Sequence, residues 1–102
     1  MSDATLPYAF VAKLVAADGS EDALASFLTG AVDLANDEAG TIVWFAVRTD
    51  ARTFWIFDAF RTEADRTAHA GGAIVEALQQ NGELLGAAPE ILPAEVLAEK
   101  LP

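Results

Sequence analysis

The sequence predicts an α+β fold in which helices cover one face of a four-stranded antiparallel sheet. Two runs rich in β-branched and aromatic residues, Thr41–Arg48 and Thr53–Phe60, flank a short polar gap and are typical of a β-hairpin. A third such run precedes them at Tyr8–Ala17. Segments with helical spacing of apolar residues alternate with these runs, which gives the order β-α-β-β-α.

Length and composition favour a single globular domain over residues 1–102. Hydrophobic residues make up 53% of the chain and charged residues 22%, a balance typical of folded domains. Sixteen acidic residues against six basic ones give a net charge of −10. Because nucleic acids and anionic membranes bind clustered Lys and Arg, we expect neither among the partners. The absence of cysteine excludes disulfides and thiolate metal sites.

The sequence also lacks the usual signals of secreted and membrane proteins. Its first ten residues, MSDATLPYAF, contain neither a basic segment nor a long apolar run, so we expect no signal peptide. No stretch approaches the roughly 18 uninterrupted apolar residues of a membrane span. We therefore expect a cytoplasmic protein.

Residue spacing predicts the first strand and the first helix. Residues 1–6 are expected to be disordered, and Tyr8–Ala17 to form a strand that is mostly apolar on both faces. Asp18 or Ser20 can cap a helix that runs from Glu21 to about Asn36. The apolar residues of this helix follow the i, i+3, i+4, i+7 pattern of a helix that packs on a sheet by one side.

The second half of the chain predicts two short helices and an ambiguous tail. Thr62 is a candidate cap for a helix over Glu63–Ala70, and two glycines separate this helix from another over Ala73–Asn81. The tail, Pro89–Pro102, has good helix formers, but it could equally be a strand whose prolines require an edge or a bulge. With that strand the order becomes the ferredoxin-like split βαβ pattern.

The composition of the hairpin predicts a partner for the sheet. Neither Thr41–Arg48 nor Thr53–Phe60 alternates apolar and polar residues, as strands with one solvated face do. The helices cover one face, and the sequence offers nothing to cover the other. Because a large exposed apolar patch usually marks an interface, we expect a homodimer in which a second copy packs sheet to sheet.

Short motifs lie at defined points of this pattern. Glu38–Thr41 leads into the second strand, Phe57–Phe60 ends the third, and Ala68-His69 lies on the second helix. With the hairpin and the closing stretch Leu92–Pro102, these motifs resemble the antibiotic biosynthesis monooxygenase-like family of dimeric α+β barrels over roughly residues 8–100. The resemblance favours a strand for the tail.

The resemblance implies a homodimer whose sheets form a barrel, with a pocket between sheet and helices in each subunit. Some members of the family oxygenate aromatic polyketides or quinols with molecular oxygen and no metal or flavin, and close relatives degrade haem. The chain departs from the family pattern where Phe57, Asp58 and Phe60 stand for Tyr, Glu and Trp, and its first strand has no Asn, which argues against the haem-degrading branch.

We therefore expect a monooxygenase that uses no cofactor and acts on a small aromatic or quinol. A non-catalytic dimer of the same fold, which binds a small molecule or has a structural role, is the alternative. The lost Tyr and Trp favour this alternative, whereas the retained His69 favours the enzyme.

His69, the only histidine, is the candidate catalytic residue. Its imidazole can act as a general base or as a hydrogen-bond donor to a phenolic substrate, because it titrates near neutral pH. Oxygenation without a cofactor requires removal of a proton, so that an enolate or phenolate can meet oxygen. Alternatively, His69 is a structural or surface histidine at a helix end.

Trp44, Trp55, Phe57 and Asp58 are the candidate substrate-binding residues. The aromatic residues could wall a pocket for a flat ligand, or they could fill the core or the dimer interface.

A carboxylate on an apolar strand is costly unless it is paired. Asp58 is therefore expected to orient His69 or to form an ion pair with Arg48 or Arg61. One histidine and no cysteine make a poor transition-metal site, and glycine-rich nucleotide motifs are absent, so we expect no metal ligands and no cofactor-binding residues.

Overall fold

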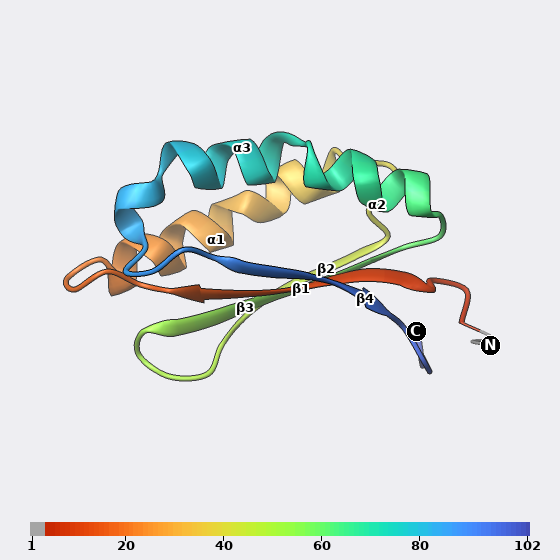
Figure 1. The fold of residues 1–102 in the computed structure, drawn as a ribbon, viewed down its shortest axis with the longest axis horizontal. Helices are drawn as coiled ribbons and strands as arrows, with labels where there is room; N and C mark the ends of the chain where they lie inside the picture. Colours follow the sequence, from red (N-terminus) through yellow and green to blue (C-terminus); the bar gives the residue numbers. More distant parts are fainter. Residues whose placement is uncertain (1–3) are drawn as a thin grey trace.

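The computed structural model, which describes residues 4–102, contains one four-stranded antiparallel sheet with all helices on one face (Figure 1). The strand order is β2-β3-β1-β4, which confirms the ferredoxin-like split βαβ fold. The elements are β1 (Tyr8–Val15), α1 (Glu21–Asn36), β2 (Val43–Arg48), β3 (Thr53–Phe60), α2 (Glu63–Ala70), α3 (Ala73–Gln80), a 3-10 turn (Gly82–Leu84) and β4 (Glu90–Glu95).

Two of the expected strands are two residues shorter in the structure. β1 ends at Val15, and Ala16 forms only an isolated bridge with Leu85 before the chain turns at residues 18–19. β2 begins at Val43, since the backbone N–H of Thr41 donates to the carbonyl of Glu38 at 3.1 Å and closes a turn before the strand. This turn brings Glu38 and Thr41 close to the junction of α2 and α3.

Strand register places the side chains of the central strands on two distinct faces. Asp58 of β3 lies opposite Phe10 of β1 and Trp44 of β2, and all three face the helices. Side chains at i and i+1 of a strand point to opposite faces. The neighbouring residue Phe57 therefore lies on the open face, which no helix covers.

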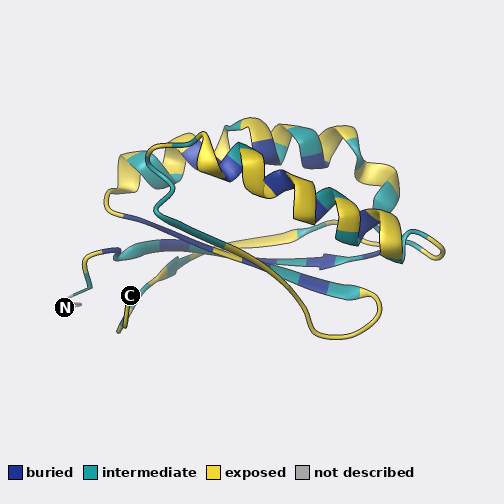
Figure 2. Ribbon diagram, turned by 180° about the vertical axis from the view of Figure 1, so that it is seen from behind, coloured by how far each residue is buried: buried dark blue, intermediate teal, exposed yellow. Residues whose placement is uncertain are grey.

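The core lies between the helices and the sheet. α1 contributes Leu24 and Leu28, which are buried against Leu14 of β1 and Phe54 of β3. Figure 2 shows buried residues along the inner sides of both layers, whereas the hairpin that joins β2 and β3 is exposed. Among the described residues, no helix has the length and apolar character needed to cross a membrane.

The tail is the edge strand that the family resemblance favours. β4 pairs with β1 alone, so Pro93 lies at the edge of the sheet, where its missing N–H leaves no inner strand unpaired. The residues after Glu95 form no regular element up to Pro102.

The disorder expected for residues 1–6 is wrong for residues 4–6, while residues 1–3 lie outside the described residues. Leu6 is buried with Ala9 and Ala59 on the open side of the sheet. The Glu99 carboxylate accepts hydrogen bonds from the backbone and hydroxyl of Thr5 and from the backbone N–H of Leu6. These contacts join the segment before β1 to the segment after β4, and Figure 1 shows that both lie at the same end of the sheet.

Apolar side chains form a continuous row across the open face. Phe45, Phe57, Val11 and Leu92 lie directly opposite one another on β2, β3, β1 and β4. Phe45 and Leu92 are 57% and 58% exposed. We name these four residues the open-face row, and their exposure agrees with the apolar second face that the sequence predicts.

Replacement of Gly30 by alanine should stabilise the fold. Gly30 lies inside α1, is exposed, and has no atom within 4 Å of the position that a Cβ would take. Because glycine in a helix interior costs about 0.5–1 kcal/mol relative to alanine, we expect Gly30→Ala to raise the free energy of unfolding by about that amount in chemical denaturation. Gly19→Ala is the matched control and should destabilise, since Gly19 has a φ of 82°. A loss of stability in Gly30→Ala would contradict this account of the helix.

Candidate active site

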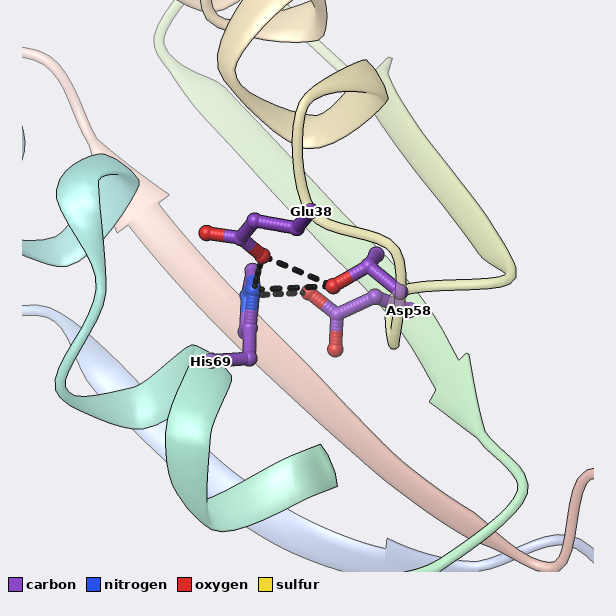
Figure 3. A network of polar contacts seen from close by, with 4 residues as sticks. Glu38, Asp58 and His69 are labelled. Atoms are coloured by element: carbon purple, nitrogen blue, oxygen red, sulfur yellow. Dashed lines mark hydrogen bonds and ion pairs between the residues drawn. The ribbon is translucent and has the colours of Figure 1, made fainter. Parts of the chain in front are cut away.

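His69 is buried between two carboxylates. Its Nδ1 lies 2.5 Å from Oε1 of Glu38, and its Nε2 lies 2.9 Å from Oδ2 of Asp58 (Figure 3). The side chain of His69 is 6% exposed and that of Asp58 is 3% exposed, whereas that of Glu38 is 21% exposed. We name Glu38, His69 and Asp58 the triad.

Three separate elements supply the triad. His69 lies in the last turn of α2 and points towards the sheet, Asp58 lies on the helix-facing side of β3, and Glu38 lies in the turn between α1 and β2. The Thr41 hydroxyl donates to Glu38 Oε1 at 2.7 Å and holds this carboxylate towards the ring.

The glycine pair between α2 and α3 makes room for Glu38. A Cβ at Gly72 would lie 2.8 Å from Glu38 Oε2 and 3.2 Å from the His69 carbonyl. Helix α2 ends at Ala70 and α3 begins at Ala73, so the break falls where the sequence places it. A side chain at position 72 would compete with the Glu38 carboxylate for the same space.

The geometry favours the imidazolium form of His69. Burial lowers the pKa of His69, but the hydrogen bonds to Asp58 and to Glu38 and the negative charges of both carboxylates raise it, and the net effect is a raised pKa. In the imidazolium form each ring nitrogen carries a proton, so each donates to one carboxylate oxygen.

A small, partly enclosed cavity adjoins the triad. It has a volume of about 100 Å³ and lies between the sheet and the α2–α3 segment. Asp58 and His69 line it together with mostly apolar residues: Phe10, Ala12, Trp44, Ile56, Ala70, Ile74, Val75, Leu78 and Ile91.

Two buried polar atoms beside this cavity have no hydrogen-bond partner within the described residues. They are Nε1 of Trp44, a donor, and Oδ1 of Asp58, an acceptor. Figure 3 shows that one oxygen of Asp58 points to His69 and the other points away from it.

His69 also borders a second, outer hollow. This depression of about 450 Å³ is lined by the turn after α1 and by the junction of α2 and α3, and both Glu38 and His69 contribute to it. The triad therefore runs from the apolar cavity at Asp58 to the protein surface at Glu38.

The structure brings together only some of the predicted site residues. Trp44, Asp58 and His69 line the same cavity. Trp55 and Phe57 lie on the open face of the sheet, because they alternate with the helix-facing residues of β3, so neither can contact a ligand beside His69 in the same chain. The Trp55 indole N–H donates to the Thr49 hydroxyl at 3.1 Å.

Of the partners weighed for Asp58, the structure selects His69. Arg48 instead donates to the backbone carbonyl of Ala51 at 2.9 Å. Sequence reasoning missed Glu38 as a site residue, although it belongs to the motif Glu38–Thr41. The spacing of that motif to His69 gives no sign of the contact, which depends on the turn after α1.

Within residues 4–102, no group of three His, Asp or Glu side chains is arranged to hold a metal ion. In the triad the ring of His69 separates the two carboxylates, so the three side chains form a chain of hydrogen bonds rather than a converging set of ligands.

Comparison with known proteins places the chain in a family. NE2512, a protein of unknown function from Nitrosomonas europaea, is 46% identical, covers 96% of each chain and superposes with a TM-score of 0.93. The chain belongs to the same family as NE2512. Neither a protein-family model nor a curated protein matches it.

Two candidate antibiotic biosynthesis monooxygenases share the fold of this family. The one from Nitrosomonas europaea is 14% identical, with a TM-score of 0.79 over 89% of this chain and 99% of its own. The one from Chloroflexus aurantiacus is 21% identical, with a TM-score of 0.71 over 91% of this chain and 95% of its own. The antibiotic biosynthesis monooxygenase-like fold expected from the motifs is thereby confirmed.

The raised pKa of His69 should make stability depend on pH. A histidine whose pKa is higher in the folded state stabilises the fold fully below its unfolded pKa of about 6.5. This stabilisation is lost as the pH rises through the folded pKa. NMR titration of the single imidazole should give a midpoint above the ordinary value.

Two variants separate the triad from general charge effects. Glu38→Gln should lower the pKa of His69, because it removes one of the two carboxylates. Asp33→Asn on the exposed side of α1 makes the same change in charge and should leave that pKa almost unchanged. An unshifted pKa in Glu38→Gln would contradict the assigned contact.

Proposed function

We propose that the chain is a monooxygenase that acts on a small aromatic or quinol with molecular oxygen and without a cofactor. The observation that carries this proposal is the triad at the wall of the cavity: the buried imidazole of His69 and the buried carboxylate of Asp58 both border an apolar space. The fold shared with candidate monooxygenases supports the reaction class.

The triad supplies what such a reaction requires. Asp58 Oδ1 accepts the proton of a substrate hydroxyl, and the positive charge of His69 stabilises the resulting phenolate. Glu38 stabilises that positive charge and, because it is partly exposed, connects the triad to solvent. His69 acts here as the cation beside the reacting group, since both of its nitrogens are engaged by carboxylates.

The reaction balances with oxygen as the only oxidant. A deprotonated hydroquinone reacts with O₂ at a ring carbon to form a peroxide. Cleavage of the O–O bond and loss of water leave a hydroxyquinone, so one oxygen atom enters the product and the other leaves as water. No external reductant is needed for this sequence.

The size of the cavity limits the substrate. Its volume is about 100 Å³, whereas an apolar protein cavity that binds benzene has about 150 Å³. A single ring therefore fits after a small outward movement of the lining side chains, and a polycyclic substrate does not fit. The proposal is accordingly restricted to substrates with one ring.

A non-catalytic binding protein is the second candidate. The specific observation in its favour is that both nitrogens of His69 are paired, which leaves no free nitrogen to act as a base. In this case the triad stabilises the fold and polarises the cavity, and a ligand binds without reacting.

Oxygen uptake distinguishes the two candidates. We expect methylhydroquinone to consume oxygen faster with the protein than without it, and anthrone, which has three rings, to show no acceleration. His69→Ala and Asp58→Asn should each lower the rate by roughly a hundredfold or more, the range that proton transfer contributes to catalysis.

The controls separate chemistry from folding. Asp33→Asn should retain full activity, and circular dichroism should show which variants are folded. Full activity in folded His69→Ala would overturn the assignment of the triad. Binding of the hydroquinone without oxygen uptake would establish the non-catalytic alternative.

We also propose that two copies pair through the open-face row. Its exposed aromatic and aliphatic side chains form a contiguous apolar surface, which rarely remains uncovered on a folded domain. A second copy presents the same row, so a two-fold axis that lies between the two open faces brings the rows together and covers both. The resemblance of the motifs to a family of dimeric α+β barrels supports this arrangement.

Charge in the open-face row should dissociate the dimer. Leu92→Glu introduces a carboxylate at an exposed position of the row, where pairing would bury it. Sedimentation velocity at micromolar concentration should give a dimer for the original chain and a monomer for Leu92→Glu. Val32→Glu makes a similar change on α1, where Val32 is 40% exposed, and should remain dimeric. A monomeric original chain would refute the proposal.

A further inference from the structure

We propose that the cavity beside the triad is a binding site for a neutral ligand with a hydroxyl on a single ring, and that Trp44 and Asp58 together hold this hydroxyl. The inference rests on the proposed function, which places the ligand in this cavity. It adds the polar group of the ligand and the two protein atoms that recognise this group. Trp44 thereby becomes the residue that determines specificity.

The first support is that a buried donor and a buried acceptor both lack a hydrogen-bond partner within the described residues. Nε1 of Trp44 can only donate and Oδ1 of Asp58 can only accept, and neither has a partner within residues 4–102. Asp58 is 2% exposed, so its free oxygen is removed from bulk solvent. Buried polar atoms of native proteins are normally paired, so this donor and this acceptor indicate a missing group between them.

The second support is strand register. Trp44 and Asp58 are directly opposite each other on β2 and β3 and face the same side of the sheet. Cβ atoms of directly opposite residues lie about 4.5–5.5 Å apart. The two side chains therefore leave neighbouring backbone positions on the same face of the sheet and line the same cavity.

A hydroxyl is the simplest group that satisfies both atoms. It donates its proton to Asp58 Oδ1 and accepts from the Trp44 N–H through a lone pair. An ether accepts only and leaves Asp58 unpaired, whereas an ammonium group donates only and leaves Trp44 unpaired. A methyl group does neither.

The charges around the cavity disfavour anions. Two carboxylates face one imidazolium in the triad, so the sum is one negative charge, and no Lys or Arg lines the cavity. The remaining lining is mostly apolar, with Phe10, Ile56 and Ile74 among it, which suits an aromatic ring. A carboxylate ligand would be repelled by Asp58.

An outer groove suggests how the ligand enters. A groove of about 360 Å³ between α3 and the start of β4 shares Val75, Leu78 and Ile91 with the cavity. Ile91 is 40% exposed and lies on the edge strand. In this proposal the ring enters past these three shared side chains, and their movement supplies the extra volume that it needs.

Calorimetric titration without oxygen tests the inference apart from turnover. The probes are phenol, anisole, toluene, benzylamine and benzoate, which keep one ring and vary the polar group. We expect phenol to bind roughly tenfold more tightly than anisole or toluene. This difference in affinity corresponds to the free energy of one hydrogen bond to a charged group. Benzylamine should bind more weakly than phenol, and benzoate should show no binding.

Two variants identify the recognising atoms. Trp44→Phe removes the donor and keeps an aromatic side chain. It should therefore lower the affinity for phenol by about three- to tenfold and change the affinity for toluene by no more than about twofold. Asp58→Asn should lower the affinity for phenol more than Trp44→Phe does. Asp33→Asn should leave the affinities for phenol and toluene unchanged. Because toluene binding reports that the cavity is intact, a folding defect cannot mimic the expected pattern.

The outcomes are distinct from those of the oxygen-uptake experiment. Phenol selectivity that depends on Trp44 supports the inference even when no hydroquinone is oxidised. Equal binding of phenol and toluene, or unchanged selectivity in Trp44→Phe, overturns it while leaving oxygen uptake as a separate question. Absence of binding by every probe also overturns it and indicates that water satisfies the two atoms.

Discussion

The buried charge of the triad constrains the rest of the structure. An imidazolium and a carboxylate removed from water are stable only when each is paired, because desolvation of a single ion costs several kcal/mol. His69 meets this condition by contacting carboxylates on both sides, one from β3 and one from the turn after α1. The helix layer and the sheet are thereby joined by polar contacts at a defined point, whereas the remaining core is apolar and non-directional.

The alternation of side chains along two strands gives the sheet two different roles. On β2 and β3, Trp44 and Asp58 face the helices, and the adjacent residues Phe45 and Phe57 face outwards. A change in the pairing of the open face would move the backbone to which the cavity residues are attached. The proposed dimer and the cavity therefore share the same two strands, and the strength of one influences the geometry of the other.

The fold follows from local patterns, and the site follows from them only in part. The hairpin, the helix break at Gly71-Gly72 and the apolar open face are properties of neighbouring residues, so the sequence predicts them directly. The tail was ambiguous because its propensity favours a helix, and pairing with β1 outweighs that propensity.

Contacts between distant residues explain what the sequence could not show. Glu38 and His69 are 31 positions apart, and their contact depends on the turn that Thr41 closes. The face on which Trp55 and Phe57 lie depends on strand register, which a run of apolar residues on both faces leaves undetermined. Asp58 was the informative exception, because a carboxylate within an apolar strand requires a partner.

Gly72 connects the stability of the helix layer with the contact between Glu38 and His69. Glycine in a helical segment costs about 1 kcal/mol relative to alanine, and a continuous helix from Glu63 to Gln80 would be the more stable local structure. On the present backbone a Cβ at position 72 would already lie 2.8 Å from Glu38 Oε2. A side chain there would therefore favour a continuous helix and at the same time compete with the carboxylate that pairs with His69.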